Sequence, residues 1–356
     1  MSSTTTSDLP QKYQLYRVHR AVLCHNSPVL SHLFSDAAPV DHYDGVPLVE
    51  MIGDSAEALA SLLAFIYDPS EVNVRRWDPD TPLTVSPAVR IANKYLVDGL
   101  RAYLVQKVKD NWPLTIEDWD RREAEIEAMR SVKATSGERP PSTKPLARSV
   151  PEPASAIRFA HEFGCPEILP AAFYQLSRMD ATYDWDRAES YDAHQDLPAR
   201  WSLLDAPDLL RVLRGKQKLA KHTGSFGDNN YTYSIILIPP CFPWWEDARY
   251  AEETEVELMR FGRPTLDPKE YPCFALLSTI FSRAFREVSP RVGDPLKAMK
   301  ECLREYERIS DVSSASPKSL CVHCERGLKW WVPWARRYLW EQLPVIFALS
   351  TPDHEV

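Results

Sequence analysis

The stretch VHRAVLCHNSPVLSHLF, Val18 to Phe34, decides the fold of the first part of the chain. Ser27-Pro28 divides it, because serine is a favoured N-cap and proline a favoured first residue of a helix. Residues 19–25 therefore predict one short helix, and a second helix begins at Pro28. The apolar residues of the second segment recur along one side of a helix, which predicts that it packs against a core.

The residues around this stretch predict a small sheet and further helices. Residues 13–18 and 46–52 are the candidate strands. Asp54 predicts the N-cap of a third helix, with Glu57 completing a capping box. Ser86-Pro87 and Asp98 mark the starts of two more helices. This order predicts an α+β fold in which a short β-sheet is capped by a cluster of helices.

The composition narrows the class of protein. Among 356 residues, 44% are apolar and 26% charged, the net charge is −8, and there are seven cysteines. An acidic chain argues against nucleic-acid binding, and no apolar window is long enough to span a membrane. The first residues contain no basic segment followed by an apolar one, so we expect no secretory signal. Because most of the cysteines stand singly in apolar contexts, we expect a cytoplasmic or nuclear protein that is not secreted.

A proline-rich segment, SVKATSGERPPSTKPLARSVPEP, predicts a flexible linker over residues 131–153, because it has too few large apolar residues to form a core. We therefore expect the following divisions: a disordered N-terminus (1–12), an α+β domain (13–113), a helical extension capped by Thr115 (114–130), the linker, and a mostly α-helical C-terminal domain (154–350).

Taken together, residues 13–113 resemble a BTB/POZ domain. The resemblance rests on Val18, His19, Arg20, Val22-Leu23, Ser27 and Leu33-Phe34, and on the later LLAFIYDP and IANKYLVDGLRAYL segments. Residues 156–176 and 340–349 resemble the fungal, basidiomycete-type branch of this family. The resemblance implies a non-enzymatic protein-interaction module. It implies a substrate adaptor for a cullin-3 ubiquitin ligase or a transcriptional co-regulator.

The resemblance also names Arg20 as an interface candidate. In the family, an Asp upstream of the His and the basic residue after it meet near the dimer interface. Here Asp8 is followed by Leu9-Pro10-Gln11-Lys12, which does not suit the centre of a strand. The sequence therefore predicts that the first strand of the usual homodimer is missing, and both a homodimer and a monomer stay open.

His19 and Cys24 offer an alternative interpretation as a catalytic pair. A cysteine nucleophile needs its base within hydrogen-bond reach, which neighbouring positions on a helix do not supply. The interpretation we favour is that His19 is a partly buried residue at a helix start and that Cys24 packs in the core. No paired carboxylates, nucleotide motif or Ser/His/Asp set stands out, and we expect no enzyme activity.

Cys321-Val-His-Cys324 is the one short cysteine pair. A C-x-x-C pair commonly supplies two of the four ligands of a zinc ion. The further ligands would come from Cys241, Cys273, Cys302 and His323, which are scattered along the sequence. We expect no cofactor if these thiols are simply packed, and the alternative is a zinc-binding structural or regulatory protein that uses Cys321 and Cys324.

A run of aromatic residues near the C-terminus offers an interface candidate. Trp330, Trp334 and Tyr338 follow the i, i+4, i+8 spacing of one helix face, which favours core packing. Trp331 would then face another way, so we expect it to contact a partner protein. Pro333 requires a kink or break in this helix.

Overall fold

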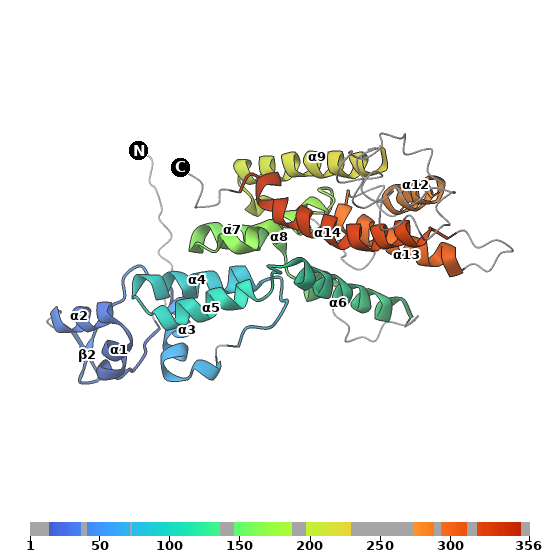
Figure 1. Cartoon of the computed structure of the whole chain (residues 1–356). Helices are drawn as coiled ribbons and strands as arrows, with labels where there is room; N and C mark the ends of the chain where they lie inside the picture. The colour runs from blue at the N-terminus through green and yellow to red at the C-terminus, as the bar shows by residue number, and fades with distance from the viewer. Residues whose placement is uncertain are drawn as a thin grey trace, which may run out of the picture. The chain divides into compact units, whose positions relative to one another are not determined.

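The computed structural model describes residues 14–36, 41–71, 73–135, 146–186, 197–228, 273–287, 293–311 and 319–349 (Figure 1). The predicted disorder of residues 1–12 and the break at Asp8 lie outside these ranges. The chain divides into two compact units. The first holds the residues up to Trp112 together with Arg148–Pro151 and Phe159–Cys165, and the second holds the rest.

The first unit combines a small sheet with a group of helices, which confirms the predicted α+β class. Its elements are α1 (Arg20–Asn26), α2 (Pro28–Asp36), β1 (Asp41–Tyr43), β2 (Val46–Leu48), α3 (Ala56–Tyr67), the 3-10 turn η1 (Pro69–Glu71), α4 (Thr81–Lys94) and α5 (Asp98–Lys109). Residues 14–19 have no regular structure, so the short strand expected there is wrong.

Ser27 starts α2 as the sequence predicts. Its hydroxyl oxygen accepts a hydrogen bond from the backbone N–H of Leu30 at 3.0 Å, which is the N-cap interaction. The same hydroxyl donates to the backbone carbonyl of Tyr95, 68 residues away in the chain. Ser27 is completely buried. One side chain thus fixes the start of α2 and ties it to the end of α4.

Two of the predicted helix starts are wrong. Ser55, not Asp54, caps α3, since its hydroxyl accepts a hydrogen bond from Ala58 N at 3.1 Å. Asp54 instead accepts hydrogen bonds from Lys94 and from the hydroxyl of Tyr95. The fourth helix begins at Thr81, with Pro82 in its first turn, and runs through Ser86-Pro87.

The two strands form an antiparallel hairpin in which Tyr43 pairs with Val46. The turn consists of Asp44 and Gly45, whose φ angles are 53° and 72°. Two positive φ angles in a two-residue loop define the turn that matches the twist of a hairpin. The strand expected over 46–52 is therefore real but ends at Leu48.

The second unit is mostly helical, as predicted for the C-terminal region. Its larger elements are α6 (Ile116–Thr135), α8 (Leu169–Ser177), α9 (Ala206–Asp228), α12 (Phe274–Ser282) with the π-helical turn Arg283–Glu287, α13 (Pro295–Asp311) and α14 (Val322–Ile346). The helix α7 (Pro153–Phe163) contributes residues to both units. None of the helices in the described part of the chain is long and apolar enough to cross a membrane.

The short helix α8 lies at the centre of the second unit. Eight of its nine residues are buried, including Phe173 and Tyr174, which have no exposed surface. The ring of Phe347 stacks on that of Phe173 at a centroid distance of 5.6 Å. Since apolar burial is the main favourable term in folding, α8 is the element around which the other helices of this unit are organised.

The segment predicted as a linker, residues 131–153, is ordered at both of its ends. Helix α6 continues to Thr135, and Val150 and Glu152 are only 3% and 2% exposed. The carboxylate of Glu152 accepts hydrogen bonds from Ala154 N and Ser155 N, which caps α7, and a third from Arg200 N. Residues 136–145 lie outside the ranges that the structure describes.

Candidate functional site

The helix α1 carries the residues that raised the question of a catalytic pair. The backbone N–H of His19 donates to the hydroxyl of Tyr67 at 2.7 Å, and its Nδ1 atom lies 3.3 Å from the same oxygen. Cys24 is half-buried, and Leu23 points into the core with 4% of its surface exposed. His19 is more exposed than expected. The segment packs through Leu23 and places the hydroxyl of Tyr67, rather than a thiol, beside His19.

Two surface features of the first unit are available for contacts. Arg20 is exposed at the first position of α1. Tyr43, Val46 and Leu48, here called the hairpin patch, share one face of the β1–β2 hairpin, since Tyr43 pairs with Val46 and Leu48 lies two residues further along. These three side chains are 60%, 39% and 39% exposed. The hairpin therefore presents apolar side chains to solvent.

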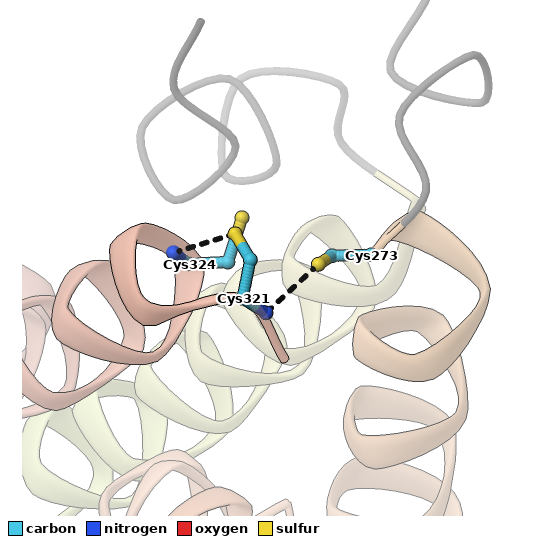
Figure 2. A group of neighbouring side chains, drawn as sticks. All are labelled: Cys273, Cys321 and Cys324. Carbon is cyan, nitrogen blue, oxygen red and sulfur yellow. Dashed lines mark hydrogen bonds between the residues drawn. The ribbon is translucent and has the colours of Figure 1, made fainter. Parts of the chain in front are cut away.

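Three cysteines of the second unit lie together (Figure 2). Cys321 and Cys324 belong to the start of α14, and Cys273 directly precedes α12. The three Sγ atoms all lie within 4.8 Å of one another. Cys273 is one of the scattered candidates for a further zinc ligand. The fold brings it to the C-x-x-C pair although 48 residues separate it from Cys321.

Backbone amides point at two of these sulfur atoms. The N–H of Cys321 donates to Sγ of Cys273 at 3.3 Å, and the N–H of Cys324 donates to Sγ of Cys321 at 3.5 Å. Cys321 is thereby the N-cap of α14. Two other candidates have different surroundings: Cys302 is completely buried in α13, and His323 lies outside the three-cysteine group. Cys241 lies outside the described residues.

The aromatic residues of α14 face in the opposite sense to the prediction. Trp331 is 1% exposed and packs edge-on against Phe281 at a centroid distance of 5.3 Å. Trp330, Trp334 and Tyr338 are 57%, 43% and 48% exposed and stack on one another along the helix. The expectation that Trp331 contacts a partner is therefore wrong, because this ring belongs to the core.

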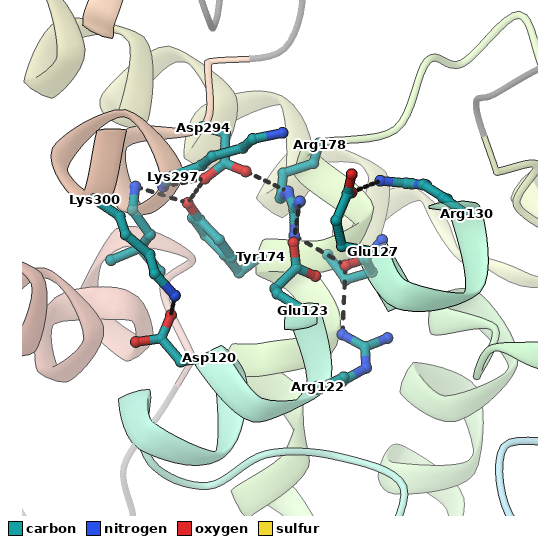
Figure 3. A network of polar contacts seen from close by, with 12 residues as sticks. Asp120, Arg122, Glu123, Glu127, Arg130, Tyr174, Arg178, Asp294, Lys297 and Lys300 are labelled. Atoms are coloured by element: carbon teal, nitrogen blue, oxygen red, sulfur yellow. Dashed lines mark hydrogen bonds and ion pairs between the residues drawn. The ribbon is translucent and has the colours of Figure 1, made fainter. Parts of the chain in front are cut away.

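A polar network joins α6, α8 and the residues before α13 (Figure 3). Arg178 pairs with Asp294 at 2.8 Å and with Glu123 at 2.7 Å. The hydroxyl of Tyr174 donates to Asp294 at 2.6 Å. Burial would raise the pKa of Glu123, but the charge and hydrogen bond of Arg178 hold it below its usual value. Burial raises the pKa of Tyr174 well above its usual value, and the charge of Asp294 adds to this effect.

The neighbouring residues extend the network on both sides. Arg336 on α14 makes two hydrogen bonds of 2.7 Å to the carboxylate of Asp120, which also pairs with Lys300 at 3.2 Å. The guanidinium groups of Arg122 and Arg178 lie 5.4 Å and 5.2 Å from the ring centroid of Trp119. Burial lowers the pKa of Arg122 to about 10. The ion pairs of Arg178 and Asp120 cross from one helix to another, so the network holds four helical segments together. No sequence pattern indicates this network, since its members lie far apart in the chain.

Comparison with known proteins identifies the class of the first unit. Residues 9–111 match the BTB/POZ domain model. The match covers less than a third of the chain, and it agrees with the resemblance found for residues 13–113. No curated protein and no solved structure matches the chain.

The chain thus carries a BTB/POZ domain at its N-terminal end, followed by a mostly helical region. BTB/POZ domains are protein-interaction modules, and many of them dimerise. The family match ends at residue 111, so it says nothing of α6 to α14.

Proposed function

We propose that this protein is a non-enzymatic adaptor that works in the cytoplasm or nucleus and binds another protein through its BTB/POZ domain. The family match of residues 9–111 is the observation that carries this proposal. The hairpin patch supports it, because apolar side chains gathered on one exposed face are typical of interaction surfaces. The partner that we favour is a cullin-3 ubiquitin ligase, to which the protein would bring a substrate.

Co-purification of the full-length chain with cullin-3 tests the adaptor role. We expect a complex at micromolar concentration. Tyr43→Asp places a charge in the hairpin patch, and we expect it to weaken the complex if cullin-3 binds there. Leu83→Asp is the matched control, since Leu83 is an exposed apolar residue on α4 of the same unit. The absence of a complex with the unaltered chain would remove the adaptor interpretation.

The alternative within the same class is a transcriptional co-regulator. Fusing the full-length chain to a DNA-binding domain and measuring a reporter gene separates the two roles. A change in reporter output that persists without cullin-3 would favour the co-regulator, and an output that never changes would count against it.

We further propose that the domain forms a homodimer in which Arg20 lies at the interface. Arg20 supports this because it is exposed at the start of α1 and occupies the basic position of the family pattern. Light scattering on the full-length chain should give a dimer, and Arg20→Glu should shift it toward the monomer. Arg75→Glu is the control, since Arg75 is an exposed arginine of the same unit. A monomeric unaltered chain would contradict the proposal.

Two finer assignments stay predictions. The likeness of residues 156–176 and 340–349 to fungal members of the family is one of them. The other is the second candidate function, a zinc-binding structural or regulatory protein, which the convergence of Cys273 with Cys321 and Cys324 favours.

A further inference from the structure

We propose that Cys273, Cys321 and Cys324 bind one zinc ion through three thiolates. This site goes beyond the interaction role and does not depend on it. The three Sγ atoms lie within 4.8 Å of one another. Zinc–sulfur bonds of about 2.3 Å place the corners of a tetrahedron about 3.8 Å apart. Sulfur movements of about 1 Å would therefore complete the coordination.

Backbone N–H groups donate hydrogen bonds to two of the sulfur atoms. Zinc binds cysteine as the thiolate, and a hydrogen bond donated to sulfur stabilises that form. Sγ of Cys273 accepts from Cys321 N, and Sγ of Cys321 accepts from Cys324 N. Cys321 also stands at the N-terminus of the 25-residue helix α14, where the helix dipole favours a negative charge.

Simple apolar packing is the competing explanation, and Cys302 shows what it looks like in this protein. The thiol of Cys302 points at a carbonyl oxygen of its own helix, that of Ala298, at 3.5 Å, so it donates rather than accepts. Burial raises the pKa of Cys302, which keeps this thiol protonated. Cys273 and Cys321 differ, since their sulfur atoms face N–H donors.

Three thiolates leave one position of a four-coordinate zinc ion open. Cys324 has no exposed surface and Cys273 is 7% exposed, whereas Cys321 is partly exposed. Because Cys321 is partly exposed, water can fill the fourth position. Soft thiolate ligands select zinc over magnesium or calcium. The bound ion would tie the start of α14 to the start of α12.

Metal analysis of the full-length chain, produced with zinc and purified under reducing conditions without chelator, tests the site. We expect roughly one zinc per chain, the content of a single thiolate site. Cys273→Ser, Cys321→Ser and Cys324→Ser should each lose most of it. Cys24→Ser is the matched control, because Cys24 is a half-buried thiol of the first unit, and its zinc content should be unchanged. Zinc near zero in the unaltered chain, or unchanged zinc in Cys273→Ser, would overturn the proposal.

A second measurement on the unaltered chain does not depend on the folding of any variant. Cobalt(II) replacing zinc should give the sulfur-to-cobalt charge-transfer and visible bands of a four-coordinate thiolate site. Zinc should also protect Cys321 from alkylation, as read by mass spectrometry, and leave Cys24 equally reactive. Equal alkylation of Cys321 with zinc and with chelator, or cobalt without charge-transfer bands, would contradict the site. Neither result bears on partner binding by the BTB/POZ domain.

Discussion

Gly215 on α9 lies directly against the ring of Phe347, which follows the end of α14. A β-carbon at Gly215 would overlap the Cδ1 and Cε1 atoms of this ring. Phe347 has no exposed surface and also stacks on Phe173, so it has little room to move away. Only a residue without a β-carbon therefore lets α9 approach the C-terminal end of α14 this closely.

We expect Gly215→Ala to destabilise the protein, because overpacking a filled core typically costs about 1–3 kcal/mol. Thermal unfolding of the full-length chain measures the effect. Gly99→Ala is the control, since a β-carbon there meets the ring of Phe65 only at an ordinary contact of 3.5 Å. Alanine is the better helix former, so Gly99→Ala should leave stability unchanged or raise it. Equal losses in the two variants would contradict the contact with Phe347.

The two adjacent tryptophans of α14 should respond differently to truncation. Trp331→Ala should cost about 3–5 kcal/mol of unfolding free energy, the usual price of removing a fully buried aromatic side chain. Trp330→Ala should stay within about 1 kcal/mol, because Trp330 is more than half exposed. Chemical denaturation of both variants gives the comparison. A larger loss for Trp330→Ala would mean that the facing of α14 is wrong.

Arg178 should contribute far more to the unfolding free energy than an arginine on the surface does. Arg178→Ala leaves Asp294 and Glu123 without their countercharge, and breaking such a buried pair costs about 3–5 kcal/mol. The exposed pair between Arg337 and Glu117 is the control, and Arg337→Ala should cost less than about 1 kcal/mol. Urea unfolding of the two variants at neutral pH measures the difference, and similar losses would contradict the structural role of the network.

The buried hydroxyl of Tyr174 predicts a loss of stability in alkali. The pKa of Tyr174 is raised in the folded protein, so the protonated hydroxyl contributes to the unfolding free energy. This contribution is complete below the tyrosine pKa of the unfolded chain, about 10, and is lost as the pH rises above that value. The unfolding free energy should therefore fall above that pH. In Tyr174→Phe the fall should be smaller, although the variant starts from a lower stability because the bond to Asp294 is gone. An identical alkaline slope in both proteins would refute the assignment.

Ser27→Ala should weaken the first unit, since it removes an N-cap worth about 1 kcal/mol and also the bond to the Tyr95 carbonyl. Ser31→Ala is a suitable comparison. Ser31 lies within α2 outside the buried core, and its replacement should be nearly neutral. Circular dichroism during thermal unfolding measures the midpoint of both variants. An unchanged midpoint for Ser27→Ala would count against the cap.

Local chemistry explains which parts of the fold could be predicted from the sequence. The start of α2 follows from Ser27-Pro28, where the cap and the first residue are neighbours in the chain. Asp54 and Ser55 are both good caps, so the sequence could not choose between them. Ser86-Pro87 repeats the pattern at Ser27-Pro28, but a helix already begun at Thr81 carries through it.

Long-range contacts explain the rest. The spacing of Trp330, Trp334 and Tyr338 shows that they share a face, but not whether that face is covered. The buried stripe is the one that includes Leu328, Leu339 and Leu343, and its aliphatic residues could have indicated that Trp331 points inward. No spacing rule connects Cys273 with Cys321, since only the packing of α12 beside the start of α14 brings the two together.

The first unit is assembled from separate pieces of chain. Glu162 pairs with Arg90, and the carbonyl of Phe163 accepts a hydrogen bond from Arg101. Phe159 and Phe163, which are nearly completely buried, belong to the same unit. A fragment cut after residue 111, where the family match ends, would lack this segment and expose the apolar surface that it covers. Excision of an autonomous domain from this gene product would therefore have to retain residues through Cys165.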